Sequence, residues 1–183
     1  GERFVNKTRP SLEAQIANLA DEIAYNNHDI DDGLRSGLIS IEQLQMLEIF
    51  ATHYAQVMRQ YPNLERRRAI AETIRAMINT LVLDLTDTTL ANIRRHQPDG
   101  VDAVRRAPAL AAFSVSMRRQ ADALKSFLLE NLYRHYRVMR MTNKARTIVR
   151  DLFVAFLNEP RLLPPDHQRP EPLHRASAHA GFP

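Results

Sequence analysis

The segment LADEIAYNNHDIDD, residues 19–32, decides how the fold is interpreted. A helix turns by about 100° per residue, and at that spacing the apolar side chains of this segment and of the turns before it share one side. These side chains are Leu12, Ile16, Leu19, Ile23 and Ile30. The opposite side carries Asp21, Tyr25, His28, Asp29 and Asp32. The pattern predicts an amphipathic helix over residues 11–31, with an acidic face left for solvent or for chemistry.

Helical spacing also governs the rest of the chain. We expect further helices over residues 40–61, 63–93, 116–135 and 141–158. Ser40 and Gln43 form a capping box at the start of the second helix, and Asn63 caps the third. Residues 80–85 include several β-branched types, but they stay in phase with the helical stripe and are predicted to be helical. The predicted fold class is all-α, without a sheet, a repeat or a sustained heptad pattern.

Glycine and proline mark the ends of these helices. Gly33 and Gly37 bracket the first turn, and prolines predict irregular links at residues 96–100 and 107–113. In the last helix we expect a buried face, formed by Ala145, Ile148, Val149, Leu152, Phe153, Phe156 and Leu157. The composition then changes to proline, histidine and small residues, which predicts a disordered tail over residues 161–183.

Composition excludes several classes of protein. The 183 residues include no cysteine, so disulfides, thiolate metal sites and a cysteine nucleophile are excluded. No apolar run approaches the roughly 18 residues that cross a bilayer, and residues 1–9 lack the apolar core of a signal peptide. We therefore expect a cytoplasmic protein without a membrane partner.

The net charge of +4 comes mostly from arginine. A planar guanidinium suits phosphate groups, which favours a nucleotide or a nucleic acid such as single-stranded DNA as partner; a general arginine bias of the genome is the alternative explanation. The glycines are too few and too dispersed for a phosphate-binding loop. The adjacent His28 and Asp29 invite a metal-site interpretation, but neighbouring residues on a helix point about 100° apart and need further ligands from elsewhere.

Longer segments of the chain resemble a known family. The sequence SLEAQIANLADEIAYNNHDIDDGL at residues 11–34 resembles the signature of bacterial deoxyguanosine triphosphate triphosphohydrolase-like proteins, in the HD-domain phosphohydrolase superfamily. The sequences LKSFLLENLYRHYRV at residues 124–138 and KARTIVRDLF at residues 144–153 resemble a later, collinear part of the same family. The resemblance covers about residues 11–165 and implies an all-α, multi-helical fold like that of an HD domain.

The resemblance also implies an activity. Members of the family hydrolyse a deoxynucleoside triphosphate (dNTP) to the deoxynucleoside and triphosphate, with a divalent metal such as Mg²⁺ or Mn²⁺ held by a histidine, a His-Asp pair and a later aspartate. Asp21 matches that last aspartate. Tyr25 matches a position near the phosphates or the sugar, and Asp29 matches a position near a sugar hydroxyl. Arg137 and Arg140 are candidates to bind the triphosphate, or else form a solvated basic helix end.

The resemblance is incomplete, because the first histidine and the His-Asp pair of the family lie upstream of its later aspartate. It implies the C-terminal portion of a longer enzyme, in which residues 1–38 end the HD domain, residues 39–160 form a helical phosphohydrolase-associated region and residues 161–183 form the tail. We expect no complete catalytic set, no bound metal and no activity in this chain alone, and a homo-oligomer as is common in the family. The alternative is a non-enzymatic helical module that binds nucleotide or nucleic acid, or that mediates oligomerisation.

Overall fold

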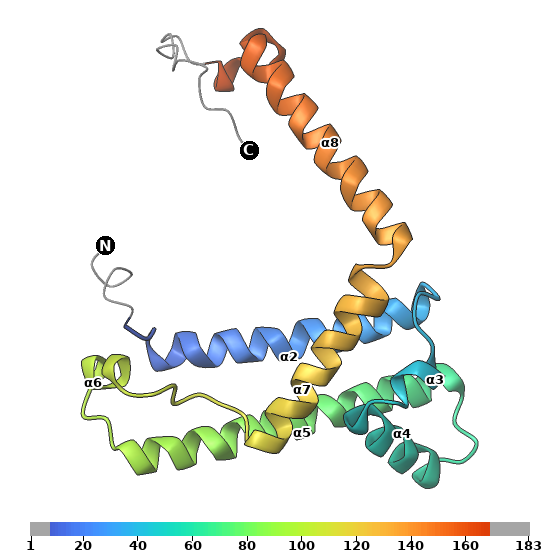
Figure 1. The fold of residues 1–183 in the computed structure, drawn as a ribbon, viewed down its shortest axis with the longest axis vertical. Coiled ribbons are helices and arrows are strands. Elements are labelled where there is room, and N and C mark those ends of the chain that lie inside the picture. Colours follow the sequence, from blue (N-terminus) through green and yellow to red (C-terminus); the bar gives the residue numbers. More distant parts are fainter. Residues whose placement is uncertain (1–7, 169–183) are drawn as a thin grey trace. The chain divides into compact units, whose positions relative to one another are not determined.

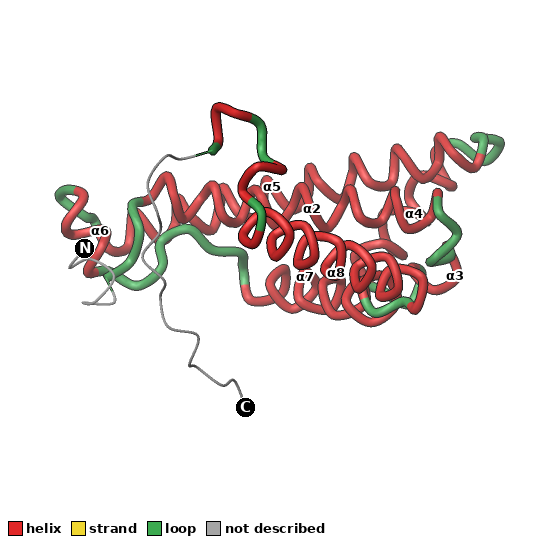
Figure 2. The backbone as a smooth tube through the Cα atoms, turned by 90° about the horizontal axis from the view of Figure 1, so that it is seen from above, coloured by secondary structure: helices red, strands yellow, loops and turns green. Residues whose placement is uncertain are grey.

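The structure is a computed structural model, and it describes residues 8–168. Within this range the regular elements are all helices, and no strand is present, as Figure 1 and Figure 2 show. The chain divides into two compact units, residues 1–135 and residues 136–183. The all-α fold class predicted from helical spacing is therefore confirmed.

The first unit packs its long helices around one core. Its elements are α2 (Leu12–Arg35), α3 (Ile41–Leu44), α4 (Glu48–Gln60), α5 (Arg66–His96), α6 (Val101–Arg106), α7 (Val115–Leu128) and the π-helix η1 (Leu129–Tyr133). Figure 1 shows α2 and α5 side by side, with α7 crossing α2. α4 packs against α5, and α7 contacts both α2 and α4. The core lies between these four helices.

The longest helix, α5, supplies a regular apolar stripe to this core. Met77, Leu81 and Leu85 recur at intervals of four residues, and each is buried. This spacing confirms that residues 80–85 continue the helix. The stripe packs with buried side chains from the other elements: Ile23, Ile30, Ile39, Ile41, Leu44, Ile49, Phe50, Phe113, Ala121, Leu124, Leu128 and Leu132.

The second predicted helix is divided into α3 and α4. The hydroxyl of Ser40 accepts a hydrogen bond from the backbone N–H of Gln43, whose side chain accepts one from the N–H of Ser40, so the predicted capping box is confirmed. The prediction of one continuous helix over residues 40–61 is wrong, because Leu47 is extended (φ −94°, ψ 122°) and becomes the N-cap of α4. The chain is reoriented at this break, and Ile49, two residues later, is buried in the core.

The predicted start of the third helix is also wrong. Asn63 does not cap it, because this residue lies in a turn closed by a hydrogen bond from the N–H of Leu64 to the carbonyl of Tyr61, 3.1 Å long. The helix begins at Arg66, with Glu65 as its N-cap.

Further boundaries depend on packing rather than on local sequence. Gly33 lies inside α2 instead of opening the first turn, and Gly37 takes the positive φ of 68°. A Cβ on Gly33 would lie 2.7 Å from Cδ1 of Ile39, so glycine allows the following segment to pack directly on the helix. The short helix α6 was not indicated by the apolar spacing, and α7 begins slightly earlier than predicted, with Ser114 as its N-cap.

An irregular segment at residues 107–114, the strap, connects α6 to α7, and its residues Leu110, Ala111 and Phe113 are buried. Its peptide groups cannot pair with one another in a helix or a sheet, so side chains take over that task. Gln15 of α2 accepts hydrogen bonds from the backbone N–H of Leu110, at 3.0 Å, and of Ala111, at 3.4 Å. The same amide donates to the carbonyl of Pro10 at 3.0 Å.

Side chains of α5 bind the strap from its other side. Asn92 donates to the carbonyl of Leu110 at 3.0 Å, and the carboxylate of Asp84 accepts from the N–H of Ser114 at 2.8 Å. Thr89, which lies between these two residues on α5, accepts a hydrogen bond from the backbone N–H of Ala112 at 3.4 Å. The strap therefore joins α2 to α5 and sets where α7 begins.

Up to residue 168, the second unit consists of α8 (Tyr136–Asn158) and two 3₁₀ turns, η2 (Pro160–Leu162) and η3 (Pro165–His167). The apolar residues of α8 recur at helical spacing on one face, as predicted. The prediction that this face is buried is wrong, because the exposed residues include Ile148, Val149, Leu152, Phe153 and Leu157. Within the described part of this unit α8 packs against η2, which is too short to cover a helix of 23 residues. Residues 169–183 of the predicted tail lie outside the described residues.

No helix within residues 8–168 is both long enough and apolar enough to cross a membrane.

Replacement of Gln15 by leucine tests the role of the strap. The variant leaves the N–H groups of Leu110 and Ala111 without their acceptor in a buried site. We expect the free energy of unfolding to fall by about 2–4 kcal/mol, at about 1–3 kcal/mol for each buried donor left unpaired. Urea denaturation followed by circular dichroism measures this change. The same substitution at the exposed Gln45 should cost less than about 0.5 kcal/mol, and an equal effect of both variants would show that the strap does not need Gln15.

Candidate functional site

The acidic face predicted from the sequence lies on the solvent side of α2. Asp21, Tyr25 and Asp29 follow one another at intervals of four residues and therefore share one side of the helix. Asp21 is exposed, Tyr25 is 63% exposed, and Asp29 is half-buried. The structure thus brings together the three side chains predicted to face a metal and a substrate. Their individual roles stay predictions.

The opposite side of α2 holds the helix in the protein. Ile23 and Ile30 are buried as predicted, but Ile16 is 39% exposed, and its predicted place in the core is wrong. The helix is rotated so that Gln15, one residue earlier, meets the strap. The side chain of Asn27 is buried, with its amide donating to the carbonyl of Ile23 at 2.8 Å and its Oδ1 without a hydrogen-bond partner among the described residues.

Asp29 is tied to a second element. The phenol O–H of Tyr133, in η1, donates a hydrogen bond to its carboxylate. Partial burial and the nearby carboxylate of Asp32 raise the pKa of Asp29, while the neighbouring His28 acts in the opposite direction. A donor at this carboxylate offsets part of the cost of taking its charge out of water. Sequence reasoning missed Tyr133, because the two residues are 104 positions apart and no spacing links them.

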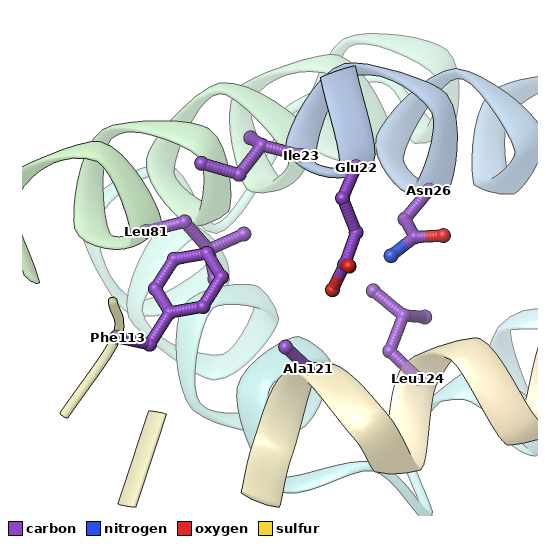
Figure 3. Close-up of a pocket in the computed structure, with 7 residues that line it drawn as sticks. All are labelled: Glu22, Ile23, Asn26, Leu81, Phe113, Ala121 and Leu124. Atoms are coloured by element: carbon purple, nitrogen blue, oxygen red, sulfur yellow. The ribbon is translucent and has the colours of Figure 1, made fainter. Parts of the chain in front are cut away.

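Glu22 points toward α7, as Figure 3 shows. Its side chain is 16% exposed, and its carboxylate accepts a hydrogen bond from the guanidinium of Arg118 at 2.6 Å and lies 3.8 Å from the ammonium of Lys125. Arg118 also binds Asp122 on its own helix, and its guanidinium lies 5.5 Å from the ring centroid of Phe113. This network joins the middle of α2 to α7.

A small pocket lies beside this network, between α2, α5 and α7 (Figure 3). It has room for about one water molecule, so it cannot hold a nucleotide. Its lining combines the Glu22 carboxylate and the Asn26 amide with apolar side chains, among them Leu81 and Phe113. We therefore assign this pocket to the packing of the helices and not to the candidate site.

The arginines predicted to bind a triphosphate belong to the second unit. The guanidinium carbons of Arg137 and Arg140 lie 5.9 Å and 5.4 Å from the ring centroid of Tyr136. Both arginines are exposed at the start of α8. The structure gathers them around this ring, and their role at the phosphates stays a prediction.

The residues present fit one ligand of a divalent metal. A carboxylate such as that of Asp21 is the hard oxygen donor that Mg²⁺ and Mn²⁺ prefer. Within residues 8–168, no group of three or more histidine, cysteine, aspartate and glutamate side chains converges to hold an ion. A divalent cation needs several ligands, so a cation at Asp21 would need further ligands from outside the described residues.

Comparison with protein families finds a match for part of the chain. The family described as the phosphohydrolase-associated domain matches residues 111–178, a range that includes α7, η1 and α8. The fold and this match together define an all-helical protein with a phosphohydrolase-associated domain.

Individual relatives are more specific. The chain is 67% identical over 178 residues to the deoxyguanosinetriphosphate triphosphohydrolase-like protein of Bordetella pertussis, covering 97% of the chain and 46% of the relative. It is 55% identical over 182 residues to the protein of that name from Thiobacillus denitrificans, covering 100% of the chain and 48% of the relative. The chain is thus a homologue of the deoxyguanosinetriphosphate triphosphohydrolase-like proteins, as the segments at residues 11–34 and 124–153 predict, and spans about half the length of these curated relatives.

The network around Glu22 predicts a difference between two adjacent arginines. Arg118→Met leaves the Glu22 carboxylate with Lys125 at 3.8 Å as its remaining cation. We expect the free energy of unfolding to fall by about 1–2 kcal/mol, less than for a fully buried pair because the Arg118 side chain is one-third exposed. Arg119→Met is the matched control, since Arg119 is 76% exposed and reaches Glu48 only at 3.6 Å. Urea denaturation should show less than about 0.5 kcal/mol for the control, and equal losses would contradict a stabilising role of the network.

Proposed function

We propose that this chain forms one wall of the active site of a metal-dependent dNTP triphosphohydrolase acting in the cytoplasm. The observation that carries the proposal is the row of Asp21, Tyr25 and Asp29 on the exposed side of α2. This row lies in a chain that is 67% identical to a protein named deoxyguanosinetriphosphate triphosphohydrolase-like. The reaction is hydrolysis of a dNTP, with dGTP as the first candidate, to the deoxynucleoside and inorganic triphosphate.

Each side chain of the row has a chemical task in this proposal. Asp21 contributes one carboxylate ligand to Mg²⁺ or Mn²⁺, and that ion, when bound, neutralises phosphate charge and activates water. Tyr25 faces the phosphates or the sugar with a phenol that both donates and accepts hydrogen bonds. Asp29 accepts a hydrogen bond from a sugar hydroxyl. Arg137 and Arg140 add cations for the triphosphate.

The chain alone is inactive in this proposal. Asp21 is one ligand of an ion that needs several, and the relatives are about twice as long as this chain. The remaining ligands therefore belong to residues outside the described part of the chain. The longer protein, and not the 183 residues alone, is the proposed catalyst.

Activity assays test this proposal. The 183-residue chain with dGTP and Mn²⁺ should release no triphosphate, as measured by ion chromatography. A protein extended to the length of the relatives should release deoxyguanosine and triphosphate in equal amounts. In that longer protein, Asp21→Asn should lower kcat at least 100-fold, whereas Asp32→Asn, which removes the same charge from an exposed position of α2, should change it less than threefold. Triphosphate release by the short chain would refute its inactivity, and an unaffected Asp21→Asn enzyme would refute the metal-ligand role.

A second candidate function is a non-enzymatic module that binds nucleic acid or mediates homo-oligomerisation. The observation that favours it is α8, which combines exposed apolar residues with exposed arginines. An exposed apolar helix face marks a surface for association. Cations on the same helix would bind phosphates in a salt-dependent manner.

Binding of single-stranded DNA distinguishes this second candidate. A labelled oligonucleotide should bind the chain more weakly at 200 mM than at 50 mM salt, as measured by fluorescence anisotropy. The double variant Arg137→Ala/Arg140→Ala should weaken binding at least fivefold and reduce the slope of affinity against salt. Arg66→Ala/Arg67→Ala, with the same loss of charge at the start of α5, is the control. Binding that both double variants leave unchanged would remove the main support for a nucleic-acid module.

A further inference from the structure

Two polar side chains of α2 meet in the small pocket between α2, α5 and α7. Glu22 and Asn26 are four residues apart, so they lie one above the other on the side of α2 that contacts α7. Figure 3 shows the carboxylate of Glu22 and the amide of Asn26 turned toward the same space, with the amide nitrogen on the side of Glu22. A hydrogen-bond acceptor and a donor therefore face each other inside the pocket.

The acceptor is the second oxygen of the Glu22 carboxylate. Oε1 accepts the hydrogen bond from Arg118 at 2.6 Å, whereas Oε2 lies 3.8 Å from Nζ of Lys125. This distance is too long for a hydrogen bond, so the ammonium contributes its charge alone. Within residues 8–168, no side chain or backbone group donates a hydrogen bond to Oε2. The side chain of Glu22 is only 16% exposed, so this oxygen still needs a donor.

The donor is the side-chain amide of Asn26. This side chain is buried, and its amide has no hydrogen-bond partner in the part of the chain that the structure describes. The next residue, Asn27, differs in this respect, because its amide donates to the carbonyl of Ile23. An amide that is removed from water without a partner destabilises the folded state. A partner for Asn26 must therefore lie in the pocket.

The rest of the pocket is apolar and small. Its other lining residues are Ile23, Leu81, Phe113, Ala121 and Leu124. Ala121 contributes a single methyl group from α7, which leaves space opposite Glu22 and Asn26. The pocket has room for about one water molecule, and a water held between two polar groups is a common way to satisfy both in a protein interior.

We propose that the pocket binds one ordered water molecule, which accepts a hydrogen bond from the amide of Asn26 and donates one to Oε2 of Glu22. Because Glu22 and Asn26 directly follow Asp21 and Tyr25, this water lies beneath the turn of α2 that carries the candidate site. A hydrated contact, and not apolar packing alone, then sets the spacing of α2 and α7 at that turn. The water site does not depend on the proposed activity.

A crystal structure and nuclear magnetic resonance of the 183-residue chain test the site directly. The crystal structure should show a water at about 2.7–3.2 Å from both Nδ2 of Asn26 and Oε2 of Glu22. In solution, the side-chain amide of Asn26 should show nuclear Overhauser contacts with a long-lived water, whereas the exposed Asn79 on α5 should show only rapidly exchanging surface water. A dry pocket, or Nζ of Lys125 in the place of the water, would overturn the proposal.

Replacement of Asn26 by leucine distinguishes a bound water from a dry gap. Leucine has nearly the size of asparagine but no donor, so it displaces the water and leaves Oε2 of Glu22 unpaired. We expect the equilibrium constant for unfolding, measured in urea, to rise about fivefold or more. In a dry gap the same change removes an unpartnered amide and adds apolar contact, so a lower or unchanged constant contradicts the proposal.

The same substitution in a Glu22→Leu background is the control. This background already lacks the acceptor, so Asn26→Leu should raise the unfolding constant much less than it does beside the native Glu22. Equal increases in the two backgrounds would show that the leucine only strains the packing of α2 against α7. The water bridge between Asn26 and Glu22 would then be refuted.

Discussion

The buried peptide groups of the strap are the constraint on which the first unit depends. A segment that is neither helix nor strand has no regular partners for its N–H and carbonyl groups, and leaving them unpaired in the interior is costly. Gln15 on α2 and Asp84 and Asn92 on α5 supply the missing partners. Because both helices hold the same segment, the strap fixes α2 against α5. It also fixes the point from which α7 starts.

Two further contacts of different chemistry join α7 and η1 to α2. The ion pair of Glu22 with Arg118 is shielded from solvent on the carboxylate side, so it loses less to screening than a surface pair. The hydrogen bond from Tyr133 to Asp29 comes seven residues later on α2. Since the strap already sets the register of α7, this last contact aligns the π-helical end with the acidic face. The geometry of the candidate site therefore depends on an interaction at the far end of the helix.

Sequence reasoning succeeded where one element decides the outcome by itself. The exposed row on α2 follows from a periodicity of 3.6 residues, and the capping box at Ser40 involves only neighbouring residues. It failed where distant residues decide. The break at Leu47, the burial of Gln15 in place of Ile16 and the π-turn of η1 each depend on what packs nearby. Local propensity carries no information about such partners, so Tyr133 was absent from the predicted site.

In α8 the amphipathic pattern predicted from the sequence is correct, but the pattern does not identify what packs against the apolar face. Its apolar stripe predicts a covered face, and burial of one large apolar side chain is worth about 1.5–3 kcal/mol. Most of the stability of helices in proteins comes from packing of the amphipathic face, so a surface that covered the exposed Leu152 and Phe153 would stabilise α8 strongly. Arg137 and Arg140 are held in place by that same helix and by Tyr136. An association that covered α8 would therefore be coupled energetically to any phosphate binding by these arginines.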